Sequence, residues 1–174
     1  MATQQNMIRV QQHGHTVTFQ PEGHATMHHS PSVRRFAEQC LADGMTMLYV
    51  DLRHCTHMDS TFLGTLLFLK RLVERRKEGK FALLSPSPQC YRLLQQMGLD
   101  RIFPIVNIED SEAGTWAELP SKPEDVAAFK RNVVQAHQEL GRLEGPTGET
   151  FRELASGLAR ELESEERERQ RGKN

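Results

Sequence analysis

Apolar and polar residues alternate in blocks along the first 110 residues, and the blocks predict strands and helices in turn. Two short stretches near the N-terminus place apolar residues at every second position, which is the period of a strand, so they are expected to form a hairpin. Later runs are continuously apolar, which is typical of strands buried on both faces of a sheet. The predicted strands are 7–11, 16–20, 45–52, 81–84 and 102–108.

Between the strands, apolar residues recur every three or four positions, as they do in an amphipathic helix. Helices are expected from Ser30 and from Ser87, where the serine can cap the helix and the proline after it fits the first turn. A third, strongly apolar helix is expected from Ser60 to about Lys77. Because strands alternate with helices, the predicted fold class is α/β, with helices packed on a sheet.

The chain is expected to divide near residue 110 into two domains, residues 1–110 and residues 111–174. The second is predicted to be an α-helical hairpin, because apolar residues recur at helical spacing after each of two capping-box motifs, at 121–124 and 150–153. The Gly-Pro-Thr-Gly segment at 145–148 is the expected turn between the two helices. The last residues alternate in charge, and their end is expected to fray.

Composition excludes several classes of function. The formal net charge is −1 and aromatic residues make up 6 %, so neither a basic field nor a stacking surface for nucleic acid is expected. The longest apolar run, within 62–69, is much shorter than a membrane span, and the N-terminus lacks the pattern of a signal peptide. We therefore expect a cytoplasmic protein with reduced structural thiols at its three cysteines, Cys40, Cys55 and Cys90.

Ser60 is the main candidate site residue, because it follows an apolar strand and a short loop and opens an apolar helix. A hydroxyl at the start of a helix lies among free backbone N–H groups that favour a negative charge. Two interpretations follow from the residues alone. Ser60 is either a helix cap, worth about 0.5–2 kcal/mol, or a phosphate acceptor whose modification leaves the fold intact. Thr61 is a competing acceptor.

The helix after Ser60 is apolar around most of its circumference, with Phe62, Leu63 and the run 66–69. One face must pack into the core. The remaining face is either an exposed patch on which a partner docks or a surface that the C-terminal hairpin covers, and the sequence leaves both open. Covering would mean that the chain inhibits its own binding surface.

No other motif predicts catalysis or a bound cofactor. The segment His54-Cys55-Thr56-His57 offers three potential metal ligands but no fourth, and we expect a polar loop there and no metal. Ser60 is not in a Gly-x-Ser-x-Gly elbow, and no phosphate-binding Gly-x-x-x-x-Gly-Lys is present. The chain is therefore not expected to be an enzyme.

Residues 7–108 resemble the STAS domain, the fold of bacterial anti-sigma factor antagonists. The resemblance is carried by the segments Leu-Tyr-Val-Asp-Leu at 48–52, Met-Asp-Ser-Thr at 58–61 and Met-Gly-Leu-Asp-Arg-Ile-Phe at 97–103. It implies a mixed β-sheet of four to five strands with packed helices, which the C-terminal hairpin extends, and no catalysis of its own.

The resemblance also implies a switch. In that family the serine after the aspartate is phosphorylated by a partner kinase of histidine-kinase-like fold, which is also an anti-sigma factor. The unphosphorylated form binds that partner, and a phosphatase reverses the modification. Carried over residue by residue, the phosphoacceptor is Ser60 and its environment is Asp51 and Asp59. As our own hypothesis, we expect Phe62, Leu63 and Gly64 to be the partner contacts.

The sequence therefore predicts a regulatory protein–protein interaction domain switched by reversible serine phosphorylation. Phe62 stands where the family usually has glycine, which predicts either a divergent partner or a domain that is no longer phosphorylated. The alternative is a structural scaffold that self-associates through its STAS fold and hairpin into a homo-oligomer, with Ser60 as a helix cap only.

Overall fold

A mixed β-sheet with helices forms the body of the computed structural model, which describes residues 5–109 and 114–173. The predicted domain boundary at 110/111 lies outside the described residues. In chain order the elements are β1 (Met7–His13), β2 (Thr16–Ala25), α1 (Ser30–Ala42), β3 (Met47–Asp51), β4 (Cys55–Met58), α2 (Ser60–Glu74), β5 (Lys80–Leu84), α3 (Pro88–Gln96), a 3₁₀ turn (Leu99–Arg101), β6 (Ile105–Val106), β7 (Ala117–Glu118), α4 (Val126–Leu140) and α5 (Gly145–Arg171).

The described sheet has seven strands, in the order β6-β5-β3-β2-β1-β7, and β4 pairs with β2 beside this path. β1 and β2 form the expected antiparallel hairpin, whereas β2, β3, β5 and β6 run parallel, so the predicted mixed α/β class is confirmed. The strand count exceeds four to five because β4 and β7 are short additions, whereas β6 is the part of the strand predicted at 102–108 that forms. β4 replaces the polar loop predicted at 54–57, since pairing with β2 buries Cys55 and Met58.

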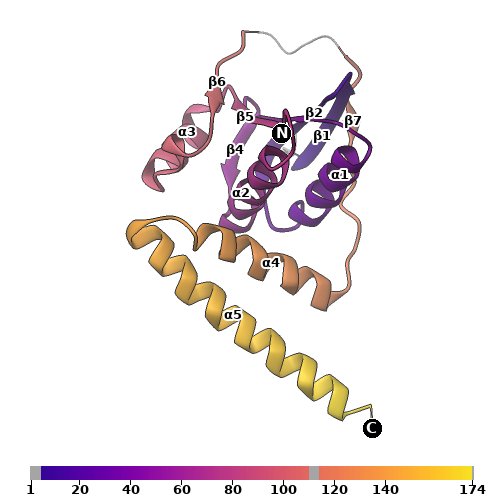
Figure 1. Ribbon diagram of the computed structural model, residues 1–174, viewed down its shortest axis with the longest axis vertical. Helices are drawn as coiled ribbons and strands as arrows, with labels where there is room; N and C mark the ends of the chain where they lie inside the picture. Colours follow the sequence, from indigo (N-terminus) through magenta and orange to yellow (C-terminus); the bar gives the residue numbers. More distant parts are fainter. Residues whose placement is uncertain (1–4, 110–113, 174) are drawn as a thin grey trace.

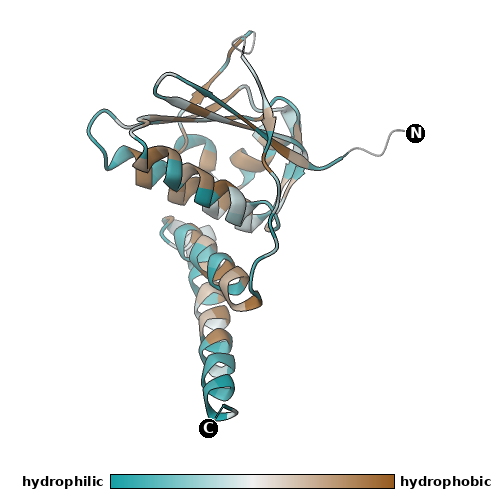
Figure 2. Ribbon diagram, turned by 90° about the vertical axis from the view of Figure 1, so that its right-hand side faces the viewer, coloured by the Kyte–Doolittle hydropathy of each residue, from teal (hydrophilic) through white to brown (hydrophobic). Residues whose placement is uncertain are grey.

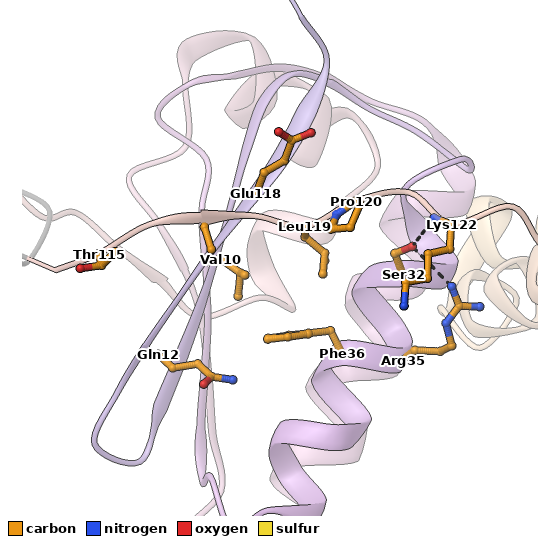
Figure 3. Close-up of a pocket in the computed structure, with 11 residues that line it drawn as sticks. Val10, Gln12, Ser32, Arg35, Phe36, Thr115, Glu118, Leu119, Pro120 and Lys122 are labelled. Carbon is orange, nitrogen blue, oxygen red and sulfur yellow. Dashed lines mark hydrogen bonds between the residues drawn. The ribbon is translucent and has the colours of Figure 1, made fainter.

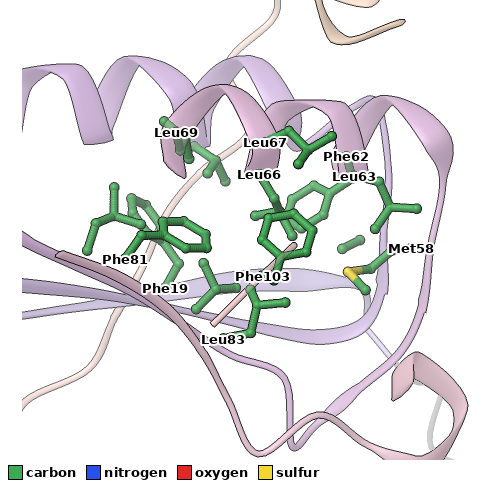
Figure 4. Packing of buried hydrophobic residues seen from close by; sticks show 14 of the residues in the cluster. Phe19, Met58, Phe62, Leu63, Leu66, Leu67, Leu69, Phe81, Leu83 and Phe103 are labelled. Atoms are coloured by element: carbon green, nitrogen blue, oxygen red, sulfur yellow. The ribbon is translucent and has the colours of Figure 1, made fainter. Parts of the chain in front are cut away.

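The core lies between the sheet and the helices that cover one of its faces (Figure 4). α2 is nearly all apolar and contributes Phe62, Leu66 and Leu69, which are fully buried together with Phe19 and Leu83 of the sheet. The three cysteines are buried and form no disulfide, in agreement with the expected reduced thiols. Among the described residues, no helix combines the length and the apolar character that crossing a membrane requires.

The C-terminal hairpin forms a further layer beyond α1 and α2, on the side away from the sheet (Figures 1 and 2). α4 packs across α2 and touches α1, and α5 packs along α4. Two ion pairs join the helices of the hairpin, from Lys130 to Glu165 (2.6 Å) and from Arg131 to Glu166 (2.9 Å). The hairpin therefore covers the helices that cover the sheet.

Two helix starts predicted from capping boxes are wrong. α4 begins after Asp125, whose side chain accepts a hydrogen bond from the Ala128 N–H (3.2 Å), because the preceding segment is held extended. In that segment the Leu119 N–H donates to the Ile8 carbonyl (2.8 Å) and the Lys122 N–H to the Ser32 hydroxyl (3.4 Å).

Whereas α4 begins later than predicted, α5 begins earlier, at Gly145, where Pro146 fits the first turn of the helix. The turn expected at 145–148 is therefore helical. Ser30 also does not cap α1; its N-cap is His29, without a side-chain bond. Ser87 caps α3 as predicted, because its hydroxyl accepts a hydrogen bond from the Cys90 N–H (3.2 Å).

Candidate functional site

Asp59, and not Ser60, caps α2. The Asp59 carboxylate accepts a hydrogen bond from the Phe62 N–H (2.8 Å) with one oxygen and from the Met27 N–H (2.7 Å) with the other. The first bond satisfies an N–H of the first turn, and the second ties the loop before α1 to the start of α2. Ser60 is the first helical residue, so its hydroxyl is not needed as a cap.

Ser60 and Thr61 differ in access. The Thr61 residue is only 3 % exposed, and its neighbour one turn on, Thr65, donates a hydrogen bond to the Thr61 carbonyl. Ser60 is half-buried. Of the two hydroxyl groups at the start of α2, that of Ser60 is thus the one near the surface.

The Ser60 hydroxyl contacts α4 of the hairpin. Its Oγ lies 3.0 Å from Nε2 of His137, and the other ring nitrogen, Nδ1, lies 2.8 Å from the Val133 carbonyl oxygen. Because a carbonyl oxygen only accepts, Nδ1 carries a proton, and in the neutral ring Nε2 accepts from the Ser60 hydroxyl. The ring also stacks on Phe151 of α5, with centroids 5.7 Å apart.

A serine within 3.0 Å of a histidine nitrogen is the spacing of a nucleophile and its base. Here, however, the base is oriented by the backbone carbonyl of Val133 and not by a carboxylate, and its ring stacks on Phe151. The arrangement is therefore that of a contact between helices that engages the Ser60 hydroxyl.

α2 and α4 approach each other closely at Gly64. A Cβ atom added there would stand 2.8 Å from the Cα of Ala136 and closer still to its carbonyl oxygen. Van der Waals contact between carbon atoms is at about 3.5–4.0 Å, so only glycine fits. Gly64 lies inside α2, where glycine costs about 1 kcal/mol relative to alanine. The close approach of α4 gives this costly glycine a structural role.

Charged side chains lie around the same contact. Arg71 of α2 pairs with Glu139 of α4 (2.6 Å), and the Arg34 guanidinium of α1 lies 3.9 Å above the Phe68 ring of α2 and also contacts Gln135 of α4. Burial raises the pKa of Glu139, and the guanidinium groups of Arg34 and Arg75 partly counteract that rise. The carboxylate of Glu139 is thus surrounded by cations but poorly hydrated.

The predicted partner contacts Phe62, Leu63 and Gly64 are all buried in this form of the chain. Phe62 belongs to the core beneath α2 (Figure 4), and Gly64 lies beneath α4. Their role as partner contacts stays a prediction, and Gly64 would first have to be uncovered.

Asp51 is not brought together with Ser60. It is 1 % exposed, and its carboxylate accepts hydrogen bonds from Gln20 (3.0 Å) and from the Arg53 guanidinium (2.6 Å). Val50, the preceding residue, points into the core that α2 covers, so Asp51 points to the opposite face of the sheet. Burial alone would raise the pKa of Asp51, but hydrogen bonds from Arg53 and Gln20 outweigh it and hold this pKa below its usual value.

A hollow of about 690 Å³ lies elsewhere, between β1, α1 and the segment 115–122 (Figure 3). Val10, Phe36 and Leu119 line it, and Ser60 does not. Among residues 5–109 and 114–173, no three or more histidine, cysteine, aspartate or glutamate side chains are placed to hold a metal ion.

His137 and Glu139 were missed by reasoning from the sequence, which treated α4 as an apolar stripe. The available signal was position: His137 follows Val133 by four residues, so it shares the apolar face of the helix. A polar residue on such a face needs a hydrogen-bond partner, and here the partner is Ser60.

Comparison with known proteins places this geometry in a family. The sequence profile of the STAS domain matches residues 7–113. No protein of curated function matches in sequence.

Solved structures of similar fold include two forms of one anti-sigma factor antagonist and a second antagonist. Unphosphorylated SpoIIAA, an anti-sigma factor antagonist, is 22 % identical, with a TM-score of 0.53 over 59 % of this chain and 89 % of its own. The phosphorylated form of SpoIIAA, a Bacillus cell fate determinant, is 22 % identical, with a TM-score of 0.50 over 59 % and 92 %. An anti-sigma factor antagonist from Mycobacterium paratuberculosis is 23 % identical, with a TM-score of 0.50 over 58 % and 85 %.

Proposed function

The chain belongs to the STAS domain family, and we propose that it is a regulatory adaptor whose binding surface at α2 is switched by phosphate on Ser60. The proposed partner is an anti-sigma factor that is also a serine kinase of histidine-kinase-like fold, and a phosphatase reverses the modification. The proposed adaptor acts in the cytoplasm and catalyses no reaction itself.

The position of Ser60 as the first residue of α2 carries this proposal. A phosphate adds a charge of about −1.5 to −2 at neutral pH, and the positive end of the helix dipole favours it. The neighbouring Thr61 is buried, which favours Ser60 as the acceptor. The existence of solved SpoIIAA structures in phosphorylated and unphosphorylated forms supports a switch of this kind in a protein of similar fold.

Charge at the interface is the proposed mechanism. The phosphate would stand next to the Asp59 carboxylate, whose oxygens already accept the Met27 and Phe62 N–H groups. Two adjacent negative groups repel an acidic partner surface, and the phosphate fills any pocket shaped for a bare hydroxyl. The sheet and α2 need no rearrangement to carry this phosphate, because Ser60 stands at the positive end of the α2 dipole.

Phosphosite mapping tests the proposal directly. The protein is purified from its native host under several growth conditions, with and without phosphatase treatment, and its intact mass and modified peptides are measured. We expect one phosphatase-sensitive phosphate on Ser60, absent from Ser60→Ala. If Ser60 is unmodified under every growth condition, the proposed switch is wrong.

A pull-down then tests the effect of charge. Ser60→Ala is expected to retain the partner and Ser60→Asp to lose it. Ser156→Asp is the matched control, because Ser156 is exposed on α5 and the substitution adds the same charge. Equal capture by Ser60→Ala and Ser60→Asp would contradict the mechanism even if Ser60 is phosphorylated.

A further inference from the structure

α4 occupies the surface of α2 that the proposed function assigns to a partner. Gly64, at the centre of this surface, admits the Ala136 backbone of α4 and would admit no side chain. At one end, the Ser60 hydroxyl is engaged by His137. At the other, Arg71 is engaged by Glu139. The surface is therefore complementary to a helix, and a helix of the same chain fills it.

The fit of α4 is incomplete. Nε of Arg71 and Nδ2 of Asn132, a residue of α4, are buried without a hydrogen-bond partner among the described residues. A buried donor left without an acceptor is unfavourable, because it loses its hydrogen bond to water and gains none in return. Glu139 is buried as well, and the raised pKa of its carboxyl group shows that its ionised form is penalised there. Docking of α4 thus includes unfavourable terms beside its favourable contacts.

The engaged hydroxyl links docking to phosphorylation. Ser60 Oγ and His137 Nε2 are 3.0 Å apart, so no phosphoryl group fits between them. The stack on Phe151 and the hydrogen bond from Nδ1 to the Val133 carbonyl hold the His137 ring in this position. A kinase reaches the Ser60 hydroxyl only when α4 has moved away, and a phosphorylated Ser60 prevents α4 from returning.

We propose that α2, from Ser60 to Arg71, is a helix-docking surface on which α4 is a tethered, displaceable occupant that competes with the external partner. The partner that fits is a helix with a small residue to meet Gly64, an acceptor for the Ser60 hydroxyl and a carboxylate for Arg71. This inference rests on the proposed function in one respect, namely that a partner docks on α2.

A peptide that copies α4 tests the docking surface without any kinase. The probe is a fluorescently labelled synthetic peptide of residues 123–143, titrated into the full-length protein. A tethered helix has an effective concentration on the order of millimolar, so the wild type should bind micromolar probe weakly. Ala136→Glu places a charge where α4 meets Gly64, leaves α2 unchanged and should free the surface.

Two further variants make the test independent of one substitution. Glu139→Lys faces Arg71, Arg34 and Arg75 with like charge and should also release α4. Gln138→Glu, on the exposed side of α4, is the matched control for Ala136→Glu and should behave as the wild type. Circular dichroism and hydrogen exchange of the β-strands confirm that each variant is folded.

We expect Ala136→Glu and Glu139→Lys to bind the probe about tenfold or more tightly than the wild type and Gln138→Glu. Adding Gly64→Ala or Ser60→Asp to Ala136→Glu should abolish that gain. If both folded release variants bind the probe no better than the wild type, the inference is overturned. If Ser60 is unmodified in the native host, the proposed switch is wrong, but the peptide titration still tests whether α2 is a docking surface.

Discussion

Gly64→Ala is the most informative single change in this molecule, because its two effects act on different parts of it. Inside α2, alanine is a better helix former than glycine by about 1 kcal/mol. Between α2 and α4, the new Cβ stands 2.8 Å from the Ala136 Cα and closer to its carbonyl oxygen. The STAS domain should gain stability, because α2 becomes a better helix. The packing of the hairpin on α2 should become weaker.

The size of the second effect follows from the distance. To restore carbon–carbon contact of about 3.5–4.0 Å, the α4 backbone must retreat by roughly 1 Å or more. Forced backbone shifts of this kind cost about 1–3 kcal/mol. The retreat also lengthens the Ser60–His137 bond, now 3.0 Å, and the Arg71–Glu139 pair, now 2.6 Å. The net loss for the docked state is thus a few kcal/mol, enough to populate an undocked hairpin.

Native-state hydrogen exchange by mass spectrometry is the assay. We expect faster exchange in α4 and in the first turn of α2, with unchanged or slower exchange in β3 and β5. Gly157→Ala is the matched control: it lies inside α5 with no atom within 4 Å of the added Cβ, so it should only stabilise. The reasoning fails if Gly64→Ala protects α4 as well as Gly157→Ala does.

Three further predictions follow. Asp59→Ala removes the acceptor of the Phe62 and Met27 N–H groups and should lower the free energy of unfolding in urea by about 1–3 kcal/mol. Asp59→Asn keeps a capping oxygen and should lower it less, so equal losses for the two variants would contradict the capping role. Because the pKa of Asp51 is lowered in the folded chain, its ionised form stabilises the fold above the ordinary aspartate pKa, and this contribution is lost as the pH falls through the lowered pKa. Acid titration of stability should therefore be less steep for Asp51→Asn, and identical slopes would refute the linkage. The full chain should be a monomer in light scattering, because its hairpin packs on its own α2; a stable dimer would instead favour the scaffold alternative.

Elements with a strong local signal were predicted well from the sequence. The hairpin of β1 and β2 follows from alternation, the buried strands β3 and β5 from continuous apolar runs, and the start of α3 from Ser87 and the proline after it. These patterns are local because they depend on side-chain spacing and on a cap within three residues.

The starts of α4 and α5 were mispredicted because competing contacts decided them. No helix starts at the capping box at 121–124, because this segment is held by other hydrogen bonds. The Lys122 N–H donates to the Ser32 hydroxyl of α1, and the Leu119 N–H donates to the Ile8 carbonyl of β1. The box at 150–153 lies inside α5, where the Thr150 hydroxyl donates to the Pro146 carbonyl (3.0 Å). A capping motif is a local preference of about 1 kcal/mol, which several tertiary contacts together exceed.

The sequence by itself placed Ser60 at the start of an apolar helix and left its surroundings open, because a period of three or four residues tells which faces are apolar but not what covers them. Only the tertiary structure decided that α4 covers α2, since that choice depends on Gly64 and Ala136, which are 72 residues apart in the sequence and meet backbone to backbone. For the same reason the neighbours of Ser60 differ from those expected: folding brought His137, which had no predicted role, to Ser60 and turned Asp51 to the other face of the sheet.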